Sequence, residues 1–138
     1  MPAARAVSRL IGALVIVVAL GAVGAACSGS SAGRPSTPAT LQITTPAPNA
    51  VTGPVVALDL RLEHAKVVPA YQVGGKIRPD RGHIHVSVDG QLTQMFYGVA
   101  LKVPDLTPGT HTIQAEFVAS DHLPFANRVV AAVTFEVK

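Results

Sequence analysis

Apolar and polar residues alternate along four stretches of the chain, at residues 54–62, 82–88, 110–118 and 129–137. In each stretch one parity is aliphatic or aromatic, and the other holds most of the polar side chains. A period of two is typical of β-strands that bury one face, and residues 41–138 show no sustained helical period of 3.6. Shorter strands are expected at residues 41–45 and 101–106. The pattern predicts an all-β domain over residues 41–138, an immunoglobulin- or fibronectin-like antiparallel β-sandwich of about seven strands.

The strand predicted at residues 82–88 has one aliphatic face and one histidine face. His83 and His85 share a parity, and the residues between and after them are Ile84, Val86 and Val88. Asp89-Gly90 follows, which is a strong signal for a two-residue hairpin turn. We expect this turn to pair Val88 with Gln91, Val86 with Thr93, His85 with Gln94, Ile84 with Met95 and His83 with Phe96. This register puts Met95 on the buried face, away from the histidines.

The topology of such a sandwich brings further histidines towards this strand. The late strand at residues 110–118 is expected to run antiparallel to it, with Phe117 in the core and Glu116 at the surface. The end of one strand then lies beside the start of the other. His122 follows the late strand, and His64 ends the strand at residues 54–62 at the same pole. Four histidines are therefore expected to gather there: His64, His83, His85 and His122.

His111 belongs to the opposite pole. It ends the segment Leu106-Thr-Pro-Gly-Thr-His111, which resembles the corner that opens a late strand in immunoglobulin- and fibronectin-like sandwiches. A tyrosine tethers that corner in those domains. We expect His111 to tether it in this chain.

The histidine pole has three interpretations. Imidazoles at i and i+2 on one strand face, joined by others from adjoining segments, suit Zn²⁺ or Cu²⁺. Alternatively, a neutral histidine donates from one nitrogen and accepts at the other, so the rings tie loop backbones together. In that case His83 and His122 fasten the long, basic connection at residues 63–81 to the sandwich. The third interpretation is a surface for an unknown protein or small-molecule partner. The sequence leaves these open, and zinc or copper is the only cofactor that it suggests.

Several short motifs occur in one order: Gly82-His-Ile-His85, a strand ending in Asp89, Pro108-Gly-Thr-His-Thr112 and Asp121-His-Leu-Pro124. The combination resembles a family of exported bacterial domains of unknown function. Members of that family have Gly-His-His-His before an apolar strand, and this chain has Ile84 in place of the middle histidine. The resemblance covers most of residues 49–138 and implies a sandwich fold. It implies no activity, because none is firmly assigned to the family.

The N-terminus has the features of an export signal. Arg5 and Arg9 precede an apolar or glycine run of fourteen residues, Leu10–Val23, which suits a signal peptide and is short for a membrane span. The single cysteine, Cys27, follows Gly24-Ala-Ala26 and resembles the acylated cysteine of bacterial lipoproteins, although leucine is usual at the position of Gly24. The alternative is ordinary cleavage after Ala26. We predict a signal peptide at residues 1–26, and a lipidated Cys27 with a flexible Ser/Gly/Pro tether at residues 27–40.

Composition narrows the classes of function. Without the two leader arginines, the chain has nine Lys/Arg and eight Asp/Glu, so it is close to neutral. It lacks the basic stripe with interleaved aromatic residues that would indicate nucleic-acid binding. Ser120-Asp121-His122 are neighbours in one loop, so they cannot form a catalytic triad. We therefore expect a non-catalytic binding or structural module, anchored by lipid to the outer face of the cell membrane. The second hypothesis is an exported zinc- or copper-binding domain.

Overall fold

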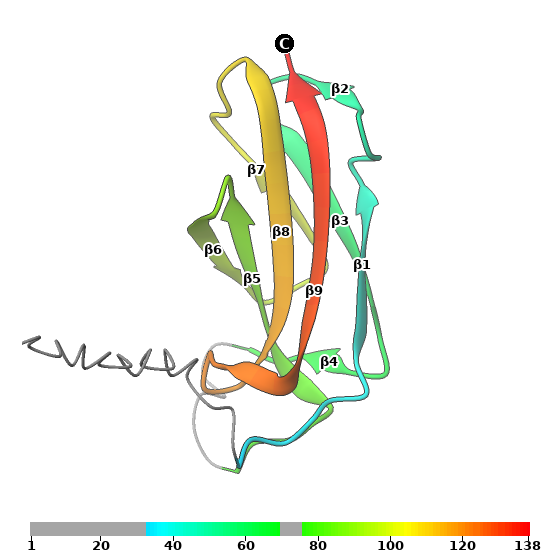
Figure 1. Cartoon of the computed structure of the whole chain (residues 1–138), viewed down its shortest axis with the longest axis vertical. Helices are drawn as coiled ribbons and strands as arrows, with labels where there is room; N and C mark the ends of the chain where they lie inside the picture. Colours follow the sequence, from blue (N-terminus) through cyan, green and yellow to red (C-terminus); the bar gives the residue numbers. More distant parts are fainter. Residues whose placement is uncertain (1–32, 70–75) are drawn as a thin grey trace, which may run out of the picture.

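The computed structural model describes residues 33–69 and 76–138, which form two β-sheets packed face to face (Figure 1). The strands are β1 (Thr40–Thr45), β2 (Val51–Thr52), β3 (Val56–Glu63), β4 (Lys66–Val67), β5 (Arg81–Val88), β6 (Gln91–Phe96), β7 (Ala100–Val103), β8 (Gly109–Ala119) and β9 (Pro124–Val137). None of the described residues belongs to a helix with the length and apolarity needed to cross a membrane. The predicted signal peptide and Cys27 lie outside the described residues.

One sheet has three strands in the order β1-β3-β7, and the other has the order β2-β9-β8-β5-β4, with β6 also paired to β5. The long strands pair antiparallel, while the two-residue strands β2 and β4 pair parallel with β9 and β5. Figure 1 shows β8 and β9 running the length of the molecule, with β3 crossing behind β9 and β1 beside it. The predicted all-β sandwich is confirmed.

The core lies between the sheets and consists of the apolar parity that the sequence shows. Residues with almost no exposure come from both sheets, and they include Leu58, Ile84, Ile113, Phe117, Phe125 and Phe135. Burying each large aliphatic or aromatic side chain contributes about 1.5–3 kcal/mol. The core therefore determines which face of each strand points inward. As a result, His83 and His85 lie on the face of β5 that points away from the core.

The predicted register of the β5–β6 hairpin is wrong by one residue beyond the turn. Val88 pairs with Gln91 as expected, but a bulge accommodates Thr93, whose hydroxyl donates to the Val86 carbonyl at 3.0 Å. Beyond the bulge Ile84 pairs with Phe96 and His85 with Met95. This shift packs the Phe96 ring against the core and leaves Met95 about half exposed. Met95 therefore lies on the face of His85, which the expected register had excluded.

The folded domain starts before the expected boundary at residue 41. The Arg34 guanidinium forms a two-pronged ion pair with Asp121, with both N–O distances at 2.8 Å, and it also donates to the Pro124 carbonyl at 2.6 Å. Thr37 is buried and exchanges two hydrogen bonds with the Asn127 side chain. Residues 34–39 are thus bound to the sandwich, because polar groups on β9 and in the loop before it satisfy their backbone.

Candidate functional site

Three of the four histidines meet at one pole of the sandwich. His83 and His85 project from the start of β5, and His122 lies in the loop between β8 and β9. The rings of His83 and His122 are stacked, with centroids 4.5 Å apart and planes 17° apart. His85 Nε2 lies 3.2 Å from His122 Nδ1, and these two rings are also nearly parallel. The three imidazoles, called the histidine stack below, form one contiguous group with His122 in the middle.

Glycine makes the backbone approach at this pole possible. Gly82 pairs with Ala119 on β8, and a Cβ added to Gly82 would lie 1.9 Å from the Val118 carbonyl oxygen. No side chain fits at that distance, so a glycine immediately before His83 allows β5 to run this close to β8. The stack therefore depends on a backbone contact as well as on its rings.

The loop that presents His122 is held from both sides. His122 has a left-handed backbone with φ of 63°, and its N–H donates to the Ala119 carbonyl at 2.9 Å. Asp121 accepts from the Leu123 N–H at 3.2 Å and pairs with Arg34. The hydrogen bonds and charge of Arg34 lower the pKa of the Asp121 carboxyl, against the effect of burial. Segment 34–39 and the histidine stack are thus joined through adjacent residues of one loop.

His83 is fully buried, and its surroundings fix its tautomer. Nδ1 lies 3.1 Å from the Val68 carbonyl and must donate to it, because a carbonyl can only accept. The neutral ring then has a bare Nε2, and this atom has no hydrogen-bond partner among the described residues. Burial, and next the proximity of His122, lower the pKa of His83; the carbonyls of Val68 and Ser120 oppose this. The ring is therefore held neutral, and it fastens the segment after β4 to the sandwich.

His85 is less buried and lies near an ion pair. Burial lowers its pKa most and His122 adds to this, whereas the Glu116 carboxylate acts in the opposite direction. Glu116 was expected at the surface, but it is only 8% exposed, because Arg128 on β9 covers it with two hydrogen bonds of 2.7 Å. The contact between His85 Nε2 and His122 Nδ1 needs one N–H donor and one bare nitrogen. Two N–H donors facing each other there would repel.

The stack does not have the geometry of a metal centre. The ring centroids of His85 and His122 are 5.5 Å apart, and the nearest nitrogens of the two rings are 3.2 Å apart. The difference is about two ring radii, which is the value expected when both nitrogens lie on the line between the centroids. The two nitrogens therefore point straight at each other. An ion between them would lie closer than the 2.0–2.1 Å that zinc needs. The stacked rings of His83 and His122 direct their lone pairs along parallel planes rather than to one point. Residues 33–69 and 76–138 contain no group of three or more metal-binding side chains arranged to hold an ion.

The other predicted site residues lie apart from the stack. His64 follows β3 with a φ of 61°, and it lines a shallow hollow with Lys66 and Asp80. His111 is at the opposite pole, where Nδ1 lies 2.7 Å from an Asp89 oxygen and Nε2 donates to the Thr107 carbonyl at 2.8 Å. The hydrogen bonds that His111 donates to the Asp89 carboxylate and the Thr107 carbonyl raise the pKa of His111. His111 thus ties the corner before β8 to the β5–β6 turn.

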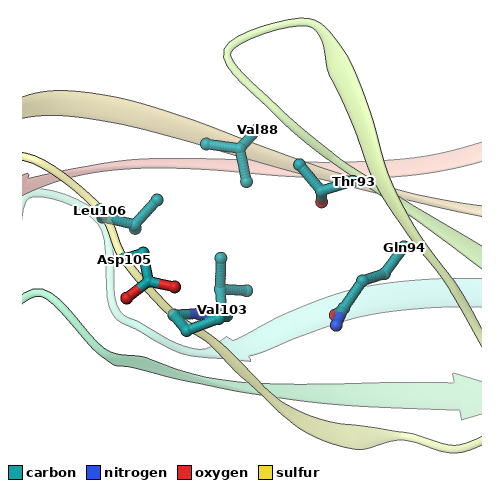
Figure 2. Close-up of a pocket in the computed structure, with 7 residues that line it drawn as sticks. Val88, Thr93, Gln94, Val103, Asp105 and Leu106 are labelled. Carbon is teal, nitrogen blue, oxygen red and sulfur yellow. The ribbon is translucent and has the colours of Figure 1, made fainter.

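A cleft that the sequence analysis missed opens between the sheets near the His111 end (Figure 2). Its volume is about 410 Å³, and the nearly buried side chains of Val88 and Val103 lie at its base. Figure 2 shows Asp105 and Gln94 on opposite sides of this apolar base. Within the described part of the chain the Asp105 carboxylate forms no ion pair, and its φ of 60° is unusual for a residue other than glycine. An apolar group bearing a cation would complement this lining. Only the packing of two distant strands creates the cleft, so no local motif marks it.

Comparison with known proteins gives a family and no activity. Residues 3–138 match the model of a family described as "Family of unknown function (DUF6130)". The chain belongs to this family. No curated protein has significant similarity to it. A similar solved structure is the "Solution structure of the PKD domain (329-428) from human KIAA0319", which is 17% identical, with a TM-score of 0.43 over 82% of this chain and 92% of that one. The expected membership in a family of unknown function is confirmed.

Proposed function

We propose that this DUF6130 member is a lipid-anchored protein of the cell envelope that displays one non-catalytic β-sandwich on the outer face of the membrane. The observation on which the non-catalytic part rests is the geometry of the histidine stack. Its rings are committed to each other and to the Val68 carbonyl, with no nucleophile in the group. A general base must reach the proton that it abstracts, and His83 Nδ1, His85 Nε2 and His122 Nδ1 are already occupied by contacts within the protein. Structural roles for His83, His85 and His122 account for these contacts.

The anchor rests on Cys27. It is the only cysteine, it follows an apolar run with small residues at its end, and the family match begins at residue 3, within the leader. Two or more acyl chains hold a protein stably on a bilayer, since each buried CH₂ adds about 0.8 kcal/mol. A lipid on Cys27 would place the sandwich a few residues away from the membrane.

Membrane fractionation and mass measurement test the anchor. Cys27→Ser should move the protein from the membrane to the soluble fraction, whereas Ser28→Ala should leave it in the membrane. The mass of the mature N-terminus separates an acylated Cys27 from a free thiol after cleavage at Ala26. A Cys27→Ser protein that stays in the membrane, or an unmodified Cys27, would contradict lipid anchoring.

Metal binding is the second candidate, and one observation favours it. The bare Nε2 of His83 is buried, and Nδ1 donates to a backbone carbonyl, as in many histidines that bind a metal. Met95 also lies on the face of His85, which adds a soft ligand type suited to copper. His122 would have to turn away from both rings to join such a site. Elemental analysis of the untagged mature protein decides: about one equivalent of zinc or copper that is lost in His83→Gln would establish this function in place of a purely structural stack.

A further inference from the structure

The segment that follows Cys27 along the chain is bound to one end of the sandwich. This contact sets which end of the domain lies nearest to a lipid anchor. Arg34 contacts Asp121, Leu123 and Pro124, all between β8 and the start of β9. The Pro35 carbonyl also accepts from Ala126 at 3.1 Å. Six residues lie between Cys27 and Arg34, and even a fully extended chain from one to the other spans only about 25 Å. The end with the histidine stack, called the anchor pole below, is therefore the end nearest to a lipid on Cys27.

The side chains at the anchor pole suit a bilayer with negative headgroups. From His64 to Arg81 the sequence has four Lys/Arg and one Asp. Lys66 and Arg81 are exposed and are paired neighbours on β4 and β5. Basic residues close to a membrane are attracted by anionic headgroups. The positive charge is thus concentrated on the end that the chain tethers.

Apolar side chains at the same pole are exposed. Leu123 follows His122 and is 54% exposed, and Tyr97 packs edge-on against His83 while remaining 42% exposed. Tyrosine is enriched where membrane proteins meet the headgroup region. At the far end lie the carboxylates of Asp89 and Asp105, which an anionic surface would repel. Charge therefore differs between the two ends in the sense that favours docking of the tethered end on an anionic surface.

We infer that the anchor pole docks on the membrane surface, with Lys66 and Arg81 contacting anionic lipid headgroups, and that the cleft beside Asp105 points away from the bilayer. This inference rests on the proposed lipid anchor at Cys27. The partner of the anchor pole is then the bilayer itself. In this orientation β8 and β9 are perpendicular to the membrane surface. Since β9 has 14 residues and spans about 45 Å, the far end lies well away from the bilayer.

Energy transfer in vesicles tests the orientation with two matched labels. The full-length acylated protein, with Cys27 blocked by its lipid, receives one reactive thiol by Leu123→Cys or by Val51→Cys. Both positions are exposed apolar residues, at 54% and 58%, and Val51 pairs with Glu136 at the far end of β9. With an acceptor on the headgroups, transfer from position 123 should exceed that from position 51 at least about threefold, since the strand separates them by ~40 Å. Equal transfer from both labels, or the reverse order, would overturn the orientation.

Flotation separates failure of the anchor from failure of the orientation. Protein that floats with vesicles, but not as Cys27→Ser, is anchored, and its labels then report orientation alone. If both forms fail to float, the lipid anchor is wrong, and the orientation falls with it.

Charge substitutions test the headgroup contact. Lys66→Gln with Arg81→Gln should lower transfer from position 123 in anionic vesicles, because each lost charge weakens contact about fivefold at ~1 kcal/mol. Zwitterionic vesicles should show no such change, and Lys102→Gln on β7 is the matched control in both. Unchanged transfer in anionic vesicles would overturn the contact of Lys66 and Arg81 with anionic lipid.

Discussion

Acidification should destabilise the domain, and the histidine stack provides the reason. The folded state lowers the pKa of both His83 and His85, so it favours their neutral forms. The unfolded chain takes up protons on these rings as the pH falls below about 6.5, and the folded chain does so only at lower pH. The stabilisation is therefore fully present above about pH 6.5 and is lost as the pH falls from there towards the folded pKa values.

The size of this effect has an upper limit. Each histidine that is protonated only in the unfolded state changes the free energy of unfolding by about 1.4 kcal/mol per pH unit, so two change it by up to about 2.8 kcal/mol per pH unit. A domain of this size has about 5–15 kcal/mol in total, so the loss is readily measured. It is an upper limit because the stack relaxes when it gains charge.

Other groups act in different directions or pH ranges. Asp89 and Thr107 raise the pKa of His111, which therefore stabilises below about pH 6.5 and loses this effect as the pH rises through its folded pKa. Its ion pair with Asp89 lies near the surface, where solvent keeps such contributions small. The carboxyls of Asp89 and Asp121 have lowered pKa values, so their stabilisation is lost only when the pH falls below about 4. A comparison above about pH 5 thus excludes these carboxyls, and His111 offsets the effect of the stack only by a small amount of opposite sign.

Urea unfolding at about pH 7.5 and 5.5 measures the effect. The wild type should lose stability between these values, and His83→Gln with His85→Gln should lose much less, because glutamine does not titrate and still donates a hydrogen bond. His64→Gln, outside the stack, is the matched control for replacing a histidine by glutamine. A wild type with flat stability over this range, or a double variant with an unchanged slope, would refute the reasoning.

Three further predictions concern single contacts. Gly82→Ala should destabilise the domain by about 3 kcal/mol in urea unfolding, because its Cβ would overlap a β8 carbonyl at 1.9 Å; Gly53→Ala, with nothing within 4 Å, should be neutral within about 0.5 kcal/mol. Arg34→Gln should cost about 1–2 kcal/mol and speed the amide exchange of Thr37 and Ala39, since it breaks a partly buried two-pronged ion pair; unchanged exchange would contradict the binding of this segment. Glu116→Gln should lower the pKa of His85 further in an NMR titration, because the carboxylate acts to raise it; an upward shift would contradict this electrostatic assignment.

The sequence by itself determined the fold class and the faces of the long strands. The alternation in β3, β5, β8 and β9 predicted which residues face the core, because a period of two places every second side chain there. It did not predict the burial of His83 and Glu116 on the opposite face. The antiparallel pairing of β5 with β8 follows from the expected topology, and it brings the start of one strand beside the end of the other. This reasoning is enough to place His122 near His83.

Only the tertiary structure decided the local register and the arrangement of the histidine rings. The bulge at Thr93 is one residue long, and it forms because burying Phe96 outweighs a regular turn register; no local signal in the hairpin predicts that balance. The sequence also could not distinguish a metal site from a structural tie, because both need the same residues at the same spacing. The tertiary structure adds the direction of the ring planes, which the Val68 carbonyl and the loop held by Arg34 set. Spacing determines which groups meet, and packing determines how their lone pairs point.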